Sequence, residues 1–452
     1  MNFSVISNDR GPTTRLLLLD SQRGWALPAH QSREPAEANT EIRNRFGLEV
    51  TTMDLHPVNE TEPGTELQWL YVHELHGEPR TLPAGVQWVP ITELSGSMGL
   101  HPGHCEVLRL WSANHGNGNC SGRLPWRCRG WFTAATAWAT AELRKLGIKT
   151  TGPAEQLAFR ARSCLLRLPT THGWVYLKAS SPAQAHEPAL TRLLAQWFPG
   201  QVPAVLACDT AKAWMLTSDF GALRRPQGTE ETVATFYSVA EHVARIQREA
   251  AGNAADIAAT GCPDHRLDRL PMLFEELLSD EHVQSEELTS DESARLRQLI
   301  PMVARRCTHL ASFGIPETLV HHDLWRGNFR ATSSGTLLFD WADSVLGHPF
   351  FQLDILLRDL TTALNSEQAT ATVTDAYLSA WTERDSAASL REGAALAAAP
   401  SMVSRALLMR DSLTGLPLEA RTAYHGAVAA PLRSLLALSE RERPRARSPH
   451  RP

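Results

Sequence analysis

Three oxygen-bearing side chains in the C-terminal half have the types and spacing of a phosphoryl-transfer site. Asp323 is followed five residues later by Asn328, and Asp340 follows a short apolar segment that ends at Phe339. Hard divalent cations such as Mg²⁺ prefer oxygen ligands, which aspartate and asparagine supply. Phosphoryl transfer needs a positioned acceptor hydroxyl, a base for its proton, and neutralisation of the charge on the nucleotide phosphates. The spacing therefore predicts Asp323 as the catalytic base and Asn328 and Asp340 as magnesium ligands.

Further residues surround these three in a fixed order. They are His321, Gly327, Trp341 and the run Gly347-His348-Pro349. The pattern resembles the aminoglycoside phosphotransferase family, which also includes choline-, homoserine- and fructosamine-type small-molecule kinases. The resemblance implies an enzyme that uses Mg²⁺ and ATP or GTP to phosphorylate a hydroxyl of a small molecule.

Two positions depart from that family's pattern. His322 stands where a glycine is usual, which implies either an ordinary backbone conformation or some strain. Gln352 stands where an aspartate usually braces the catalytic loop, and Asp354 is a nearby residue that could compensate. These departures motivate a second hypothesis, a nucleotide-binding regulatory or scaffold protein with weak catalysis. The intact Asp323, Asn328 and Asp340 favour the enzyme.

Three residues before this region are predicted to bind the nucleotide. Residues 174–178 predict a strand ending in Lys178, after strand candidates at 156–162 and 164–169. In kinase folds such a lysine contacts the phosphates and is held by a carboxylate on the next helix. Glu187 is the only acidic residue between Lys178 and Asp209. The turn at 160–163 is expected to cover the phosphates with backbone N–H groups and the Ser163 hydroxyl.

Other residues near the predicted site have weaker claims to chemistry. The tripeptide Asp219-Phe220-Gly221 spells a protein-kinase metal motif, but it precedes Asp323, so it predicts only a turn after a strand at 213–217. His321 is expected to bond the backbone beneath the catalytic loop. Arg326 either touches a phosphate or the acceptor, or is solvated.

The elements that must position these residues are predicted from apolar periodicity. The resemblance implies an α+β, protein-kinase-like two-lobe fold over residues 131–438. Residues 131–221 would form a small β-rich N-lobe and hinge, and residues 222–438 a large helical C-lobe. Helical spacing is clearest at residues 187–197, 233–245, 296–313 and 372–381. Residues 439–452, charged and proline-containing, predict a disordered tail.

A small α/β domain is predicted at residues 1–111, followed by a Gly- and Asn-rich linker at 112–130. Strand-like runs occur at 14–19, 68–74 and 86–89, with a helix near 35–46. The turn at 25–28 and the helix resemble the Nudix family in outline. That family's metal chemistry needs several glutamates on one helix face. Here only Glu41 remains, and Asn44 and Arg45 replace a glutamate pair, so pyrophosphate hydrolysis is predicted to be lost.

Composition argues against several classes of protein. The net charge of −5 gives no global basic field for nucleic acid. No apolar run approaches the ~20 residues of a membrane helix, and no signal-peptide pattern begins the chain. Seven irregularly spaced cysteines indicate reduced thiols and a cytoplasmic location. The acidic segment at 275–292 is either a solvated face or a surface for a polycationic acceptor.

Overall fold

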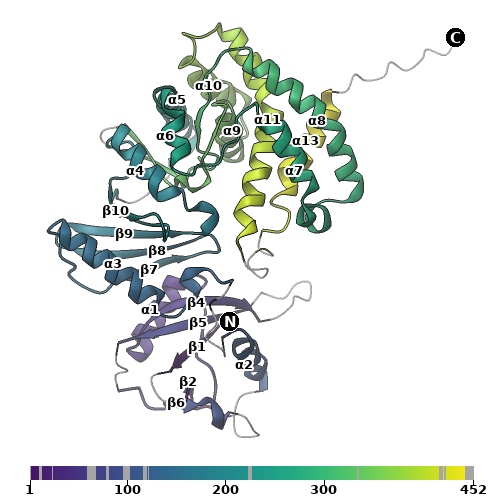
Figure 1. Cartoon of the computed structure of the whole chain (residues 1–452). Coiled ribbons are helices and arrows are strands. Elements are labelled where there is room, and N and C mark those ends of the chain that lie inside the picture. The colour runs from purple at the N-terminus through teal and green to yellow at the C-terminus, as the bar shows by residue number, and fades with distance from the viewer. Residues whose placement is uncertain are drawn as a thin grey trace. The chain divides into compact units, whose positions relative to one another are not determined.

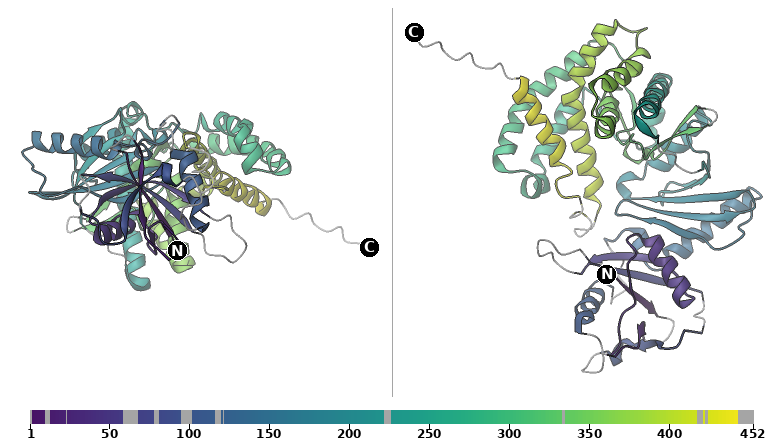
Figure 2. Two further views of the ribbon diagram at one scale, coloured as in Figure 1. Left: turned by 90° about the horizontal axis from the view of Figure 1, so that it is seen from below. Right: turned by 180° about the vertical axis from the view of Figure 1, so that it is seen from behind.

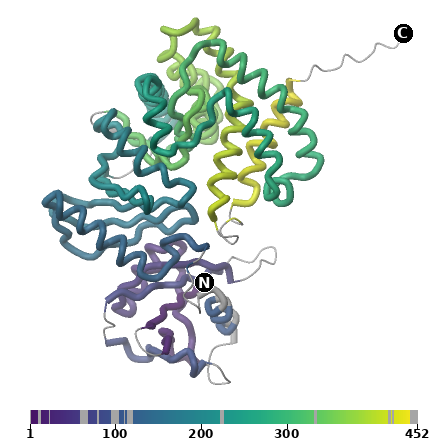
Figure 3. The backbone as a smooth tube through the Cα atoms, in the orientation of Figure 1, coloured from purple at the N-terminus to yellow at the C-terminus, as the bar shows by residue number. Residues whose placement is uncertain are grey.

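The computed structural model describes residues 2–9, 13–22, 24–58, 68–77, 81–94, 102–115, 120, 122–221, 226–332, 335–416, 421 and 424–442 (Figure 3). The chain forms two compact units, Met1–Ala179 and Ser180–Pro452. The structure is of mixed α+β class, and each unit is described by itself.

A six-stranded sheet opens the first unit (Figure 1). Its strands are β1 (Asn2–Asn8), β2 (Arg15–Leu19), β3 (Ala29–His30), β4 (Glu49–Pro57), β5 (Trp69–His76) and β6 (Val86–Pro90). The order is β4-β5-β1-β2-β6, with β3 paired to β1, and β1 and β5 run parallel. The three predicted strands are confirmed. β1 and β4 were not predicted, because buried polar residues such as Ser4, Thr52 and Asp54 interrupt their apolar pattern.

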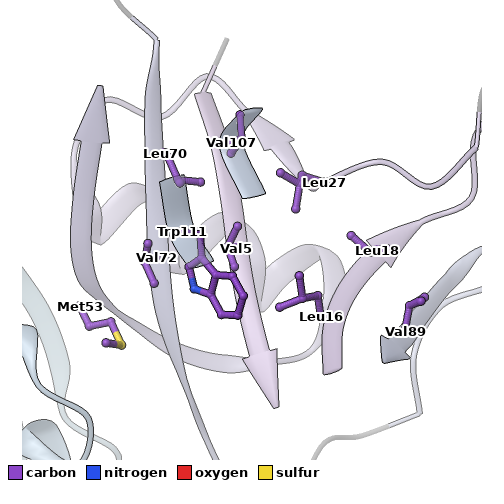
Figure 4. Packing of buried hydrophobic residues seen from close by; sticks show 10 residues of the cluster. All are labelled: Val5, Leu16, Leu18, Leu27, Met53, Leu70, Val72, Val89, Val107 and Trp111. Atoms are coloured by element: carbon purple, nitrogen blue, oxygen red, sulfur yellow. The ribbon is translucent and has the colours of Figure 1, made fainter. Parts of the chain in front are cut away.

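Two helices pack against opposite faces of this sheet, α1 (Pro35–Phe46) and α2 (Pro102–His115). Successive strand side chains point to opposite faces. Accordingly, Ile6 packs with Ile42 of α1, while Val5 packs with Trp111 of α2 (Figure 4). The predicted helix at 35–46 is confirmed, and Gly47, at φ 66°, ends it in the left-handed conformation that glycine adopts readily.

Three further strands and a helix complete the first unit. They are α3 (Trp131–Lys145), β7 (Glu155–Phe159), β8 (Ser163–Thr170) and β9 (Gly173–Ser180), and the strands lie in the order β9-β8-β7. All three strands were predicted from the sequence, with boundaries that differ by a few residues. Part of the expected linker at 112–130 is regular, since α2 continues to His115 and a 3₁₀ turn occupies Pro125–Arg127.

A buried polar network joins the six-stranded sheet to β7. The Gln156 amide accepts from Asn39 Nδ2 (2.9 Å) and from the Thr52 N–H (2.8 Å), and it donates to the Thr52 carbonyl (2.8 Å). Asn39 Oδ1 also lies 3.1 Å from Nδ1 of His73, whose Nε2 is 2.9 Å from the Ser4 hydroxyl. Burial lowers the pKa of His73 to about 3, so its ring is neutral. Because every member has a partner, the network specifies this contact rather than weakening it.

A buried carboxylate, Asp54 of β4, forms a second connection. It accepts from Arg127 Nη1 at 2.5 Å and from Arg123, and its side chain is only 1% exposed. The Arg127 guanidinium lies over the Phe159 ring at 5.4 Å from its centroid, and Trp126 Nε1 donates to the Arg160 carbonyl at 3.1 Å. Residues 123–127 therefore brace the turn between β7 and β8.

We expect Asp54→Asn to lower the free energy of unfolding by roughly 3 kcal/mol, because it leaves buried Arg127 without its counter-charge. Denaturant unfolding followed by tryptophan fluorescence measures this. Asp9→Asn is the matched control, since the Asp9–Arg129 pair is about one-third exposed and should contribute less than about 1 kcal/mol. Equal effects of the two substitutions would contradict the bracing role of Asp54.

Helices dominate the second unit, which also contains the antiparallel pair β10 (Val205–Asp209) and β11 (Trp214–Ser218). They are α4 (Glu187–Trp197), α5 (Gly228–Ala250), α6 (Ala254–Ala259), α7 (Leu270–Ser279), α8 (Ser290–Ala311), α9 (Phe351–Leu364), α10 (Glu367–Ser379), α11 (Ala387–Thr414) and α13 (Ala429–Glu442). The helices predicted from periodicity are confirmed. The long helices α8, α11 and α13 lie side by side (Figure 2). Among the described residues, no helix is both long and apolar enough to cross a bilayer.

The C-terminal helix and the acidic segment of this unit both add to the sequence expectation. α13 extends through Glu442, four residues into the segment expected to be disordered, and residues 443–452 lie outside the described part. The acidic segment is partly structural, because buried Glu287 accepts from the backbone N–H groups of Gly426 and Ala429 at 3.0 Å. Glu292 forms a capping box with Thr289 and an ion pair with Arg433.

Candidate active site

A β-hairpin brings two of the predicted site residues to one place. β13 (Phe329–Thr332) pairs with β14 (Gly335–Leu338), with Phe329 opposite Leu338. The Phe339 N–H donates to the Asn328 carbonyl at 3.0 Å and extends the pairing by one residue. Asn328 immediately precedes β13 and Asp340 lies two residues beyond β14. The two side chains therefore start from the same open end of the hairpin.

The Asn328 carboxamide links the hairpin to Asp323. Its Nδ2 donates to the Asp323 carbonyl and to Asp323 Oδ2, both at 2.8 Å. Both amide hydrogens are thereby used, so the amide oxygen is the end of the group suited to a ligand. An amide oxygen and a carboxylate, carried at the same end of one hairpin, are donors of the hard type that Mg²⁺ takes, so the residue types at Asn328 and Asp340 fit the ion.

Asp340 has an unusual backbone, with φ 64° and ψ 63°. The left-handed conformation costs a non-glycine residue about 1–2 kcal/mol. Such outliers persist where the surrounding structure determines them, and they are concentrated at functional sites. Here the conformation turns the chain sharply from β14 into the 3₁₀ turn Trp341–Asp343.

His321 ties the catalytic loop to the end of β14. Its ring is 1% exposed, and Nε2 lies 3.0 Å from the Phe339 carbonyl, so Nε2 carries the proton and donates. Nδ1 is then an acceptor, 3.4 Å from the Asp323 N–H, which also donates to the His321 carbonyl at 2.7 Å. Burial lowers the pKa of His321, which keeps the ring neutral. The prediction that His321 bonds the backbone beneath the loop is confirmed.

His322, the first departure from the family pattern, is strained. Its φ is 52°, so of the two alternatives predicted from the sequence, backbone strain is confirmed and an ordinary conformation is not. Helix α11 stabilises this conformation, because the Ser404 hydroxyl lies 2.8 Å from His322 Nε2 and Arg405 Nη1 donates to the His322 carbonyl at 2.6 Å. The same hydroxyl is 2.9 Å from His265 Nδ1. Burial, with the Arg405 charge, holds the pKa of His322 well below its ordinary value.

Helix α9 holds both ends of the catalytic loop. Gln352 Oε1 accepts from the His321 N–H at 2.9 Å, so the glutamine braces the loop without a charge. Asp354 pairs instead with Arg358 at 2.5 Å. At the other end, Asp359 accepts from the Arg326 N–H (2.7 Å) and from its Nε (3.1 Å). Arg326 is thus ion-paired to α9, which neither sequence-based alternative foresaw.

The predicted nucleotide-binding residues lie on three elements. Lys178 is on β9 and Ser163 begins β8, where the Arg160 N–H donates to the Ser163 carbonyl at 2.9 Å and closes the turn. Glu187 begins α4, is 1% exposed and accepts from the Ser180 hydroxyl at 2.5 Å. The pairing of Lys178 with Glu187 stays a prediction.

The segment that carries Glu187 is fixed to the turn after Asp340. Gln184 Nε2 donates to Asp343 Oδ1 at 2.6 Å, and both residues are 3% exposed.

The Asp219-Phe220-Gly221 tripeptide forms a turn, as predicted. Asp219 accepts from the Gly221 N–H at 2.6 Å, and Phe220 packs on Phe339 at 5.0 Å between ring centroids.

The predicted site residues lie within a segment that matches a known protein family. Residues 160–390, about half of the chain, match the phosphotransferase enzyme family APH. The chain belongs to this family. It is therefore an aminoglycoside phosphotransferase-like enzyme of the small-molecule kinase class. No curated protein matches this phosphotransferase.

Solved structures resemble this phosphotransferase only distantly. A choline/ethanolamine kinase family protein from Mesorhizobium loti is 19% identical, with 67% of this chain and 95% of that one covered at a TM-score of 0.45. A choline kinase from Streptococcus pneumoniae is 13% identical, with 66% and 99% covered at 0.45. A macrolide 2′-phosphotransferase from Brachybacterium faecium is 14% identical, with 65% and 98% covered at 0.43.

The buried histidines beneath the loop predict a dependence of stability on pH. Burial and the Arg410 charge lower the pKa of His265 to about 4, with Asp264 opposing and Arg269 reinforcing the shift. Between about pH 6.5 and 4 the unfolded chain binds more protons than the folded one, so the phosphotransferase loses stability as the pH falls. His265 alone should account for about 2 kcal/mol between neutral pH and pH 5.

Urea unfolding at pH 7.5, 6.5, 5.5 and 5.0 measures this dependence. His265→Gln should make it shallower, because the group that differs between the two states is gone. His172→Gln, at an exposed turn, is the matched control and should leave the pH dependence unchanged. An unaltered slope in the His265 variant would show that this histidine is not held neutral in the fold.

Proposed function

We propose that the chain transfers the γ-phosphate of ATP or GTP to a hydroxyl of a small molecule, with Asp323 as the base and with Mg²⁺. The observation that carries this proposal is the Asn328 carboxamide, which holds the Asp323 carboxylate and backbone beside the hairpin end that bears Asp340. A base and two oxygen donors fixed in one place are what this transfer requires, since catalysis rests on positioning and charge neutralisation.

Each residue has a defined role in this proposal. Asp323 orients the acceptor hydroxyl and takes its proton as the phosphoryl group arrives. Asn328 and Asp340 would hold Mg²⁺, which when bound supplies neutralisation of the phosphate charge. Lys178, kept extended by Glu187, aligns the phosphates, and the backbone and hydroxyl at Ser163 cover them. His321 links the loop that carries Asp323 to the strand end that precedes Asp340.

The first 111 residues are proposed to be a Nudix-like domain without hydrolytic activity. Two contacts support this. Glu41, the remaining acid of the predicted set, accepts from the Ser32 hydroxyl at 2.9 Å, and Arg45 donates to the Ala29 carbonyl at 3.1 Å. Arg45 places a positive charge on this face of α1, and like-charge repulsion would disfavour a metal cation there. This supports the loss of the metal site. The seven free cysteines support a reducing compartment such as the cytoplasm.

Substitutions at Asp323 and Asp340 should separate the two roles. Asp323→Asn keeps the shape and the bond from Asn328 but removes the base, so kcat should fall by about 10²–10⁴ with nucleotide binding retained. Asp340→Ala should cost at least roughly 10³-fold in turnover, about 4 kcal/mol, and should weaken Mg²⁺-dependent nucleotide binding. Calorimetric binding of ATP and GTP, with phosphate transfer to a panel of hydroxyl compounds, measures both.

Asp411→Asn, a surface carboxylate paired with Arg410, is the matched control and should behave as the wild type. Near-normal turnover by the Asp340 variant would overturn the assignment of the site. Nucleotide binding without transfer to any acceptor would favour the regulatory alternative, and no nucleotide binding would overturn both functions.

A further inference from the structure

A groove of 680 Å³ is formed in the second unit by α9, α11 and a residue of α10. Its apolar lining comes from Leu353, Leu357, Ala394, Ala395 and Ala398, and its charged lining from Asp354, Arg358 and Arg391. Both α9 and α11 are labelled in Figure 1. None of these residues belongs to the base, the magnesium donors or the nucleotide-binding residues.

The two walls of this groove are the helices that hold the catalytic loop. α9 binds the loop through Gln352 and Asp359, and α11 binds it through Ser404 and Arg405. On α11, residues 394, 398, 401 and 405 are spaced by four, three and four, so they share one face. The row that lines the groove therefore continues to Arg405, which donates to the carbonyl immediately before Asp323.

We propose that this groove holds the body of the phosphate acceptor, and that the acceptor is a hydroxylated molecule with an apolar body and no positive charge. The inference rests on the function proposed above, because it assumes that Asp323 receives the acceptor's hydroxyl proton. It names a substrate class, whereas the sequence predicts only a solvated face or a surface for a polycationic acceptor at residues 275–292.

Charge is the first argument against a cationic acceptor. The charged groups that line the groove are held in ion pairs: Asp354 is bound by Arg358 at 2.5 Å, and Arg391 is bound by Asp375 of α10 at 2.9 Å. Arg405, further along the same face of α11, adds a third guanidinium that is mostly buried. An ammonium group in the groove would therefore meet a guanidinium group beside each of these carboxylates, and the lining offers it no unpaired carboxylate.

Aromatic content is the second argument. Ammonium ligands that lack a carboxylate partner are recognised by the faces of several aromatic rings. Among the residues that line this groove, Phe350 is the single aromatic one, and it is 2% exposed with Tyr377 and Trp381 packed against it. Apart from the three charged residues, the rest of the lining consists of apolar side chains and of threonine and serine hydroxyls, which suits a carbon skeleton with scattered oxygens.

The acidic segment does not supply the missing negative charge. Glu287 and Glu292 are bound by the start of α13 and by Arg433. Glu286 lies 3.2 Å from His282, and Asp291 pairs with Arg295. None of the acidic residues in this segment lines the groove.

The test uses three acceptors with one apolar body and different charge. They are 1,10-decanediol, 10-hydroxydecanoate and 10-hydroxydecyl-trimethylammonium, with kanamycin and choline as further cations. Binding is measured by saturation-transfer NMR and phosphorylation by transfer from labelled ATP. We expect the diol or the hydroxy acid to bind at least tenfold more tightly than the ammonium compound, and the difference between these two tells a neutral from an anionic acceptor.

Substitutions in the groove test whether the preference for acceptors without positive charge arises there. Ala395→Phe fills the groove from an exposed position, so it should raise the acceptor KM or Kd at least tenfold while the nucleotide KM stays unchanged. Ala388→Phe, also exposed on α11 but outside the groove, is the matched control. Arg358→Glu together with Arg391→Glu should shift the preference towards the ammonium compound.

The inference is overturned if the cationic compounds bind as tightly as the others, if none of the uncharged or anionic compounds binds, or if Ala395→Phe has no effect. Asp323→Asn distinguishes this failure from failure of the proposed function. Phosphorylation of kanamycin or choline that is lost in Asp323→Asn would keep the function and reject the groove assignment. If the acceptors bind in a groove-dependent way but no nucleotide binds, the groove assignment is kept and the proposed function is rejected.

Discussion

The position of the Asn328 carboxamide is the constraint on which the site depends. Its two hydrogens are committed to Asp323, and its backbone begins the hairpin that leads to Asp340. His321 provides a second link between the catalytic loop and the hairpin, because its ring donates to the Phe339 carbonyl. The chain accepts left-handed conformations at His322 and Asp340 to achieve this, each at a cost of about 1–2 kcal/mol. Hydrogen bonds from Ser404 and Arg405 to His322 offset part of that cost.

Helices α9 and α11 serve two purposes at once. Through Gln352, Asp359, Ser404 and Arg405 they fix the catalytic loop, and with their neighbouring turns they line the groove. Asp323 lies between His321 and Arg326, and both of these are bound to α9, so a molecule that moves this helix would also move the loop that carries Asp323. Recognition of an acceptor and alignment of the base are therefore parts of one packing arrangement.

The sequence predicts what is local and leaves undetermined what is distant. Asp323, Asn328 and Asp340 fall within one short segment, so their spacing alone suggested a common site, and the helices followed from apolar periodicity. Asp359 and Arg405 were missed because their loop partners lie 33 and 83 residues away, and nothing in the pattern links them. Gln352 shows the limit of substitution rules, since a neutral amide makes the bracing bond that an aspartate usually makes in the family pattern, without compensation from Asp354. β4 was missed because its buried polar residues conceal the strand pattern.

Gln156 has a consequence for how such a chain could evolve. Gln156 lies on β7, just before the family match begins at residue 160, and its amide forms hydrogen bonds to Asn39 of α1 and Thr52 of β4. If the first hundred residues were lost, this amide would have no hydrogen-bond partners from Asn39 and Thr52. It would be either buried and unsatisfied or newly exposed to solvent. A shortened chain would therefore need a compensating change at position 156, so the two parts of the first unit constrain each other's sequence through this one amide.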